Sequence, residues 1–369
     1  MALQQSSSQA LPPPVKGWDT RESLADMPID HAVIMDNWFP GTDKVTMRRG
    51  NSAYATGLTG NVDTLIEYVP LTGAGALFAA DGSNSIYDVS SAGAVGSAVS
   101  SGHANSKWQF VNMGTSGGQF VRCFNGADTP LLYNGSSWAT TAITGSGLTA
   151  ANLIWGNLHQ RRLWTGESNS LDAWYLSTNN VSGAATKFPL GGIATLGGFI
   201  MAMGTWTRDS GSGMDDVACF YTSEGEVLVY QGTDPSASAT WALLGVFRIG
   251  KPIGRRCMVK GGSDLILVTQ DGFVPLSGIL TMDRSQTRLV ALSDQISKAV
   301  NDAVRLYKAN FGWQPILYPR AAMLIFNVPI SIQESHQYVF NTITGAPARF
   351  KGVNALCFGL LNDNMYWGG

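Results

Sequence analysis

The chain has 369 residues, enough for one large repeat domain or two ordinary domains. Only 14% of the residues are charged, whereas glycine occurs 43 times and aromatic residues make up 10%. This composition is typical of many short strands joined by tight turns and argues against long solvent-facing helices. The formal net charge of −2 and a pI near 6.1 exclude a general electrostatic attraction for nucleic-acid phosphates.

The first 16 residues form a polar arm rich in Gln, Ser and Pro, which closes in Pro12-Pro13-Pro14. No basic region followed by an apolar one is present, so the arm is not a secretory signal. We interpret residues 1–16 as a flexible N-terminal arm, and the alternative is an arm that becomes ordered against a neighbouring subunit. The most apolar window, Leu196 to Trp206, is too short and too rich in glycine to span a bilayer.

Residues 17–50 differ in composition and form an aromatic-rich docking segment. We expect this segment to pack onto the main domain, because large apolar residues recur along it: Trp18, Met27, Ile29, Val33, Ile34, Met35, Trp38 and Phe39. Asp30 to Asp36 are predicted to make two helical turns, with Asp30 as the cap. Val45 to Arg49 are predicted to form a strand that ends at Gly50.

From residue 51 onward, one short unit recurs. In Ala76 to Asp88, two apolar runs flank the turn residues Asp81-Gly82-Ser83-Asn84-Ser85, which indicates a β-hairpin because Gly and Asn tolerate positive φ. Similar pairs of runs are centred on Val121–Phe124 with Leu131–Tyr133, Arg162–Gly166 with Ala173–Tyr175, Ala218–Tyr221 with Val227–Tyr230, Leu265–Val268 with Phe273-Val274, Met323–Phe326 with Tyr338–Phe340, and Leu356–Phe358 with Met365-Tyr366.

The spacing of this unit indicates the fold. Tyr87, Tyr133, Tyr175 and Tyr230 close successive copies at intervals near the length of one four-stranded propeller blade. We therefore predict an all-β chain in which residues 51–369 form a β-propeller of antiparallel four-stranded blades. Five to seven blades are compatible with the pattern, and six is our prediction.

One helix is predicted inside the propeller domain, at residues 293–307. Ser293 is its expected cap, and an apolar face recurs at helical spacing. The apolar face comprises Ile296, Val300, Ala303, Val304 and Tyr307, and the opposite face comprises Lys298, Asn301, Asp302 and Arg305.

The last hairpin ends at Met365-Tyr366-Trp367, which leaves the final blade short of strands. A propeller ring closes when the last blade borrows a strand from the other terminus, and Val45 to Arg49 or Leu65 to Tyr68 are the expected donors. If neither pairs there, the final blade is incomplete or is finished by another subunit.

No catalytic, cofactor-binding or metal-binding residues are predicted. Gly114-Thr115-Ser116-Gly117-Gly118 matches a nucleophile pattern, but a strand follows where that chemistry needs a helix, so we expect a loop. The paired acids Asp215-Asp216 are interpreted as a solvated loop rather than a cation site. The four histidines lack metal-ligand spacing and are expected at the surface or in loops: His31, His103, His159 and His336. The four cysteines are expected to be buried thiols.

Three arginine doublets are the main basic features: Arg48-Arg49, Arg161-Arg162 and Arg255-Arg256. Consecutive residues of a strand point to opposite faces, so one member of each doublet should face solvent or a partner. Salt bridges within or between subunits are favoured over contact with DNA. The candidate interface residues of the chain are Trp18, Trp38, Phe39, Arg48 and Arg49.

Several patches resemble the tail nozzle proteins (tail tubular protein B type) of short-tailed bacteriophages. They are Gly17-Trp18-Asp19 to Met27-Pro28, Ala32 to Pro40, Thr46 to Gly50, His159 to Gly166 with Trp174 to Ser177, and Thr269 to Ser277. The resemblance implies a β-propeller subunit of a virion, assembled in the host cytoplasm as a sixfold ring below the portal and adaptor. Such a ring holds DNA and then conducts it during ejection, without specific binding. The resemblance implies no enzyme activity and no cofactor, and it implies the portal, the adaptor, and fibre or spike proteins as partners.

Two alternatives come from other classes. A glycan-binding or glycan-cleaving propeller for receptor recognition would carry paired carboxylates or exposed Trp at its axis. An intracellular scaffold for protein partners would lack sixfold assembly.

Overall fold

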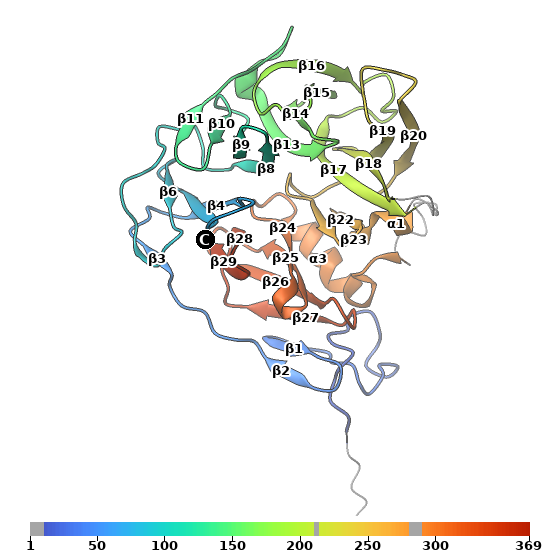
Figure 1. Ribbon diagram of the computed structural model, residues 1–369. Coiled ribbons are helices and arrows are strands. Elements are labelled where there is room, and N and C mark those ends of the chain that lie inside the picture. Colours follow the sequence, from blue (N-terminus) through green and yellow to red (C-terminus); the bar gives the residue numbers. More distant parts are fainter. Residues whose placement is uncertain (1–10, 210–213, 280–289) are drawn as a thin grey trace, which may run out of the picture.

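The structure, a computed structural model, describes residues 11–209, 214–279 and 290–369. Figure 1 shows small antiparallel sheets that follow one another around a ring. Six sheets with three or more strands occur in the described residues, and they form a six-blade β-propeller. The predicted fold class is therefore confirmed, including the number of blades, but two of the six sheets have three strands instead of the predicted four.

The blades follow the order of the chain, and each begins with its innermost strand. The first blade consists of β4 (Val62–Tyr68), β5 (Ala76–Asp81) and β6 (Ile86–Asp88). The second consists of β8 (Gln109–Thr115), β9 (Gly118–Phe124), β10 (Leu131–Tyr133) and β11 (Trp138–Thr140). The third consists of β13 (Leu153–His159), β14 (Arg162–Glu167), β15 (Asp172–Leu176) and β16 (Gly183–Pro189), and β12 (Ile143–Thr144) pairs parallel to β16.

The next three blades complete the set. The fourth blade consists of β17 (Ile200–Asp209), β18 (Met214–Thr222), β19 (Glu226–Gly232) and β20 (Trp241–Arg248). The fifth consists of β21 (Met258–Gly261), β22 (Asp264–Thr269) and β23 (Gly272–Pro275). The sixth consists of β24 (Gln314–Tyr318), β25 (Met323–Pro329), β26 (Ser335–Asn341) and β27 (Pro347–Lys351). The repeated hairpin of the sequence is the second and third strand of each blade, for example β5 with β6 and β18 with β19.

Apolar side chains fill the space between neighbouring blades, which holds the ring together. Between the third and fourth blades, Trp164 stacks on Trp241 with ring centroids 5.6 Å apart. Glycines make room for such rings, because a Cβ on Gly166 would lie 2.5 Å from the Trp155 ring and one on Gly156 would lie 2.3 Å from the Phe124 ring. Gly166 thus makes room for a ring of its own blade, and Gly156 makes room for a ring of the preceding blade.

The predicted helix is present in a modified form. A 3-10 turn at Asp294–Ile296 leads into α3 (Ser297–Tyr307), which packs against β23 and β25. The predicted apolar face is confirmed, with Val300 and Val304 buried. The predicted Ser293 cap is wrong, because the Ser293 hydroxyl accepts a hydrogen bond from the Phe273 backbone N–H instead. Short helical turns also occur at α1 (Leu276–Ile279), Ala150–Asn152 and Pro319–Ala321.

The N-terminal segment lies along the outer edge of the sixth blade. It forms the hairpin β1 (Trp38–Pro40) and β2 (Val45–Met47), and β1 packs beside β27 (Figure 1). The predicted helical turns at Asp30 to Asp36 are wrong, because Ala32 and Asp36 make isolated parallel bridges with Trp18 and Arg349. Backbone pairing with the edge of the blade satisfies these peptide groups better than a two-turn helix would.

The ring is completed by a two-stranded hairpin, β28 (Cys357–Leu361) and β29 (Asn364–Gly368), between the sixth and first blades. Both predicted strand donors are wrong, because β2 pairs with β1 and Leu65 to Tyr68 belong to the inner strand β4. Two further short strands, β3 (Ala55–Thr56) and β7 (Gly93–Ala94), pair with each other. Within the described residues the C-terminal hairpin therefore remains two-stranded.

Side chains from both neighbouring blades hold this hairpin. The Glu67 carboxylate accepts a hydrogen bond from the Leu360 N–H at 2.6 Å, and the Gln314 amide bonds both backbone groups of Phe358 at 3.2 Å. Backbone N–H and C=O groups on the inner edge of β28 have no neighbouring strand to pair with, and these side chains supply their hydrogen bonds instead.

Candidate functional site

The N-terminal segment carries an unusual number of exposed apolar side chains. Trp38 and Met47 are cross-strand neighbours on β1 and β2 and are 44% and 67% exposed. Further exposed apolar side chains on this segment are Leu24, Ile29, Val33 and Ile34. We call these six residues the apolar N-terminal surface. Contiguous exposed apolar groups are typical of contact sites, whereas scattered single residues are not.

Strong contacts fix this segment to the sixth blade. Arg349 donates two hydrogen bonds to the Asp36 carboxylate, at 2.6 and 2.9 Å, and Lys351 lies 3.0 Å from the same group. Burial opposes ionisation of Asp36, but the bonds from Arg349 and Lys351 hold its pKa below the usual value. The Arg349 guanidinium also stacks on the Trp18 ring at 4.8 Å. The segment that carries the exposed apolar side chains is therefore held against the sixth blade by these contacts.

The five predicted interface residues differ in their exposure to solvent. The Trp18 side chain is only 3% exposed and packs edge-on against Tyr338, so it is part of the subunit core. Phe39 and Arg48 are half-buried, whereas Trp38 and Arg49 are exposed. Trp38 and Arg49 are thus open to a partner, and the assignment of these residues to an interface stays a prediction.

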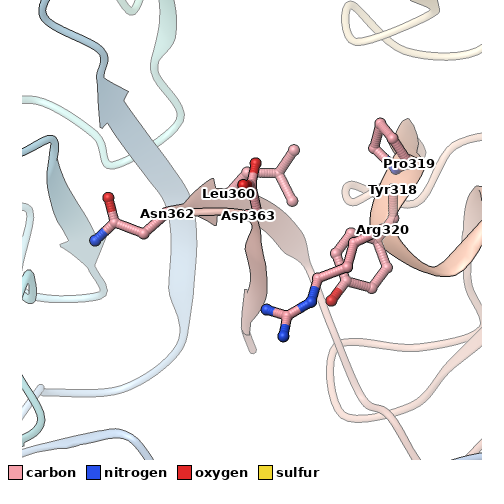
Figure 2. A pocket seen from close by; sticks show the side chains of 6 residues that line it. All are labelled: Tyr318, Pro319, Arg320, Leu360, Asn362 and Asp363. Atoms are coloured by element: carbon pink, nitrogen blue, oxygen red, sulfur yellow. The ribbon is translucent and has the colours of Figure 1, made fainter.

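A shallow pocket opens between the sixth blade and the C-terminal hairpin (Figure 2). It has a volume of about 530 Å³ and is lined by Tyr318, Pro319, Arg320, Leu360, Asn362 and Asp363. Arg320 donates a hydrogen bond to the Asn364 side chain at 2.7 Å. The lining residues come from two chain segments about 40 residues apart and belong to no motif, so sequence reasoning did not find this pocket.

The chemical motifs of the sequence are located as follows. The predicted loop at Gly114–Gly118 is shorter than expected, because Gly114 and Thr115 end β8, Gly118 begins β9, and Ser116 and Gly117 alone form the turn between them. The Asp215-Asp216 pair lies on β18 and not in a loop, and the Thr207 hydroxyl donates a hydrogen bond to Asp216 at 2.7 Å. Across residues 11–209, 214–279 and 290–369, no group of three or more potential ligands could hold a metal ion. No helix of the same ranges is long and apolar enough to cross a membrane.

Burial shifts the pKa values of cysteine and histidine side chains singled out in the sequence. The four cysteines are free and buried, as predicted, and burial raises the pKa of the Cys257 and Cys357 thiols to about 12. His159 was expected at the surface, but it is 1% exposed and sits 3.2 Å from the Thr205 hydroxyl. Burial lowers the pKa of His159 to about 4, so the ring is neutral at pH 7.

The arginine doublets are only partly accounted for by salt bridges. Arg162 lies 3.2 Å from Asp234, whereas Arg161 is exposed. Arg48 donates a hydrogen bond to the Asn37 side chain at 3.1 Å. Arg255 and Arg256 make no salt bridge with any described residue.

No protein-family model matches the chain, and no curated protein matches it. Many solved structures are similar in shape, and three of them serve as examples. The BBS1N chain of a BBS1N–ARL6DN complex has a TM-score of 0.46 at 9% identity and covers 82% of this chain and 85% of its own. A candidate 6-phosphogluconolactonase from Bacteroides fragilis has a TM-score of 0.41 at 12% identity, covering 79% and 81%. AofleA from Arthrobotrys oligospora has a TM-score of 0.38 at 10% identity, covering 85% of both chains. Similarity at this level gives no guide to activity or partner.

Proposed function

We propose that this protein is a structural subunit of a short phage tail, in which copies assemble into the distal nozzle ring that retains and then conducts DNA. The observation that carries the proposal is the apolar N-terminal surface, held on the outer edge of the sixth blade by Arg349 and Asp36. A subunit of a closed ring needs a patch that fits a different patch on the next copy. The resemblance of residues 17–50 to nozzle proteins concerns this same segment.

The charge of the chain agrees with the proposed role. A conduit must let DNA pass without trapping it, and fixed positive charge would bind the phosphates. With a net charge of −2 the subunit lacks such an excess. The portal and adaptor complex and fibre or spike proteins are the proposed partners, and the proposal gives the protein no catalytic role.

Point substitutions test this proposal better than removal of residues 1–40. Such a deletion would also remove Trp18 and Met35 from the core, and their loss would destabilise the sixth blade. Trp38→Glu combined with Met47→Glu places two charges on the exposed hairpin β1–β2 and leaves the core unchanged. We expect the wild-type protein to form rings with a central hole in electron micrographs, and the double variant to remain monomeric with unchanged circular dichroism.

The matched control is Leu71→Glu, because Leu71 is 85% exposed but lies outside the N-terminal segment. This variant should form rings like the wild type. Wild-type protein that stays monomeric at high concentration, or a double variant that still forms rings, would contradict the proposal.

A second candidate function is glycan binding in the pocket of Figure 2, because Tyr318, Arg320 and Asp363 combine an aromatic ring with hydrogen-bonding groups. Asp363 is the one carboxylate among the six lining residues, whereas glycoside cleavage normally uses two. Binding is therefore favoured over cleavage in this pocket. A saccharide array probed with wild type and Arg320→Ala would test this function. If the wild type bound no saccharide, glycan binding in this pocket would be contradicted.

A further inference from the structure

The outer strand of the fourth blade, β20, has a long free edge. It is eight residues long, and its outer side pairs with no backbone group of the described chain. The outer strands of the first, second and fifth blades have only three or four residues. In the other two blades the N-terminal segment covers β27, and β12 pairs with part of β16.

The side chains of β20 make this edge suitable for contact with another chain. Long free edges are normally protected by charged residues or proline, but β20 has neither before its last residue, Arg248. The register with β19 shifts by one residue at Leu244, which therefore has no cross-strand partner. Leu243 and Leu244 are 40% and 41% exposed. The edge thus presents two consecutive leucines together with unpaired backbone groups.

The hairpin β1–β2 has the same two properties. β2 pairs with β1 on one side, and no described strand pairs with its other side. Trp38 and Met47 are cross-strand neighbours on this hairpin and belong to the apolar N-terminal surface. Two free strand edges that meet across an interface satisfy each other's backbone groups, and their exposed apolar side chains leave water together.

The two surfaces lie at different places on the rim of the propeller. Figure 1 shows β20 and the hairpin β1–β2 at the periphery, in different directions from the centre. The fourth and sixth blades are two positions apart among six, which is about one third of a turn. In a flat ring of six copies, the two neighbours of each copy are also about one third of a turn apart. Surfaces on opposite blades would instead extend a straight filament.

We propose that β20 of one copy receives the hairpin β1–β2 of the next copy, with the propeller axes parallel to the ring axis. This inference rests on the proposed function and adds the second face of the contact between subunits. Trp38 and Met47 of one copy pack on Leu243 and Leu244 of the next. Because the two surfaces lie on different blades and do not overlap, each copy can bind two neighbours at once.

Mixing two variants tests this inference. Leu243→Glu with Leu244→Glu alters only β20, and Trp38→Glu with Met47→Glu alters only the hairpin. We expect each double variant to be monomeric in sedimentation velocity, with unchanged circular dichroism. An equimolar mixture should form a dimer of about twice the subunit mass of 39.3 kDa, because one intact hairpin meets one intact β20. A concentration of about 100 μM detects a single contact with a Kd up to that value.

The matched control is Ala139→Glu with Thr140→Glu, which places the same charges on the exposed outer strand of the second blade. This variant should form rings like the wild type. Rings formed by the β20 variant would overturn the inference and leave the proposed function standing, as would a mixture of folded variants that stays monomeric. A monomeric wild type would instead overturn the proposed function, and this inference with it.

Discussion

Glu67 is a half-buried acid at the point where the ring closes. It lies on β4, and its carboxylate accepts the hydrogen bond from Leu360 on β28. Burial raises the pKa of Glu67 to about 7, although the bond from Leu360 opposes the shift. The folded state therefore keeps a proton that the unfolded chain releases near its ordinary value of 4.5.

This shift gives stability a definite dependence on pH. Because the pKa is raised on folding, the free energy of unfolding should fall as the pH rises from about 4.5 to about 7 and stay low above it. Glu67→Gln removes the titration and keeps the oxygen that accepts from Leu360. We expect the variant to be more stable than wild type at pH 8 by up to about 3 kcal/mol, at 1.36 kcal/mol per pKa unit.

Denaturant unfolding at pH 5 and pH 8 measures the effect of Glu67. Glu22→Gln is the control, since Glu22 forms an exposed ion pair with Arg21 and should leave the pH dependence unchanged. An identical pH dependence in wild type and Glu67→Gln would rule out the assigned role of this residue.

At the scale of elements, one arginine of β27 contributes two of the contacts that attach the N-terminal segment. Arg349 both bonds Asp36 and stacks on Trp18, so Arg349→Leu should weaken the attachment of residues 17–50 to the sixth blade. We expect a loss of about 2–3 kcal/mol, the value of hydrogen bonds between charged groups. Limited proteolysis should then cut this segment faster than in the wild type.

The control for this element is Arg305→Leu on α3. Arg305 forms an exposed pair with Asp302, and such pairs contribute at most about 1 kcal/mol. If Arg349→Leu and Arg305→Leu were cleaved at the same rate within residues 17–50, the proposed anchor would be wrong.

At the scale of the whole molecule, the two-stranded hairpin joins the two ends of the ring. Cys357 on β28 packs with the first-blade residues Val62 and Leu65, whereas Phe358 packs with the sixth-blade residues Ile316 and Ile325. β28 thus connects two blades whose contacting residues, such as Leu65 and Ile316, lie about 250 positions apart in the chain.

Removal of residues 364–369 deletes β29 and leaves β28 without a partner strand. We expect the free energy of unfolding to fall by more than about 4 kcal/mol, because the hairpin then loses packing contacts with both the first and the sixth blade. Thermal unfolding followed by circular dichroism measures this, with removal of the exposed Gly369 alone as the control. A six-residue truncation that melts like the control would show that the ring does not depend on the hairpin.

The sequence alone determined the class of fold and most of its repeating unit. Alternating apolar runs around turn residues predict hairpins, because strand pairing and tight turns are local properties, and every predicted hairpin, such as Ala218–Tyr221 with Val227–Tyr230, is present. The apolar face of α3 was predictable for the same reason. The Gly114–Gly118 turn was also read correctly, since the strand that follows it is encoded next to it.

The tertiary structure alone decided how distant segments meet. Asp30 to Asp36 has a helical pattern, but pairing with Arg349, more than 300 residues away, makes it extended. The burial of His159, the two-stranded closure and the hydrogen bonds of Arg256 to Asp63 and Trp108 likewise depend on which blades become neighbours or face each other across the axis. A sequence encodes the period of a ring through local pairing, whereas contacts across the ring exist only once the blades have closed.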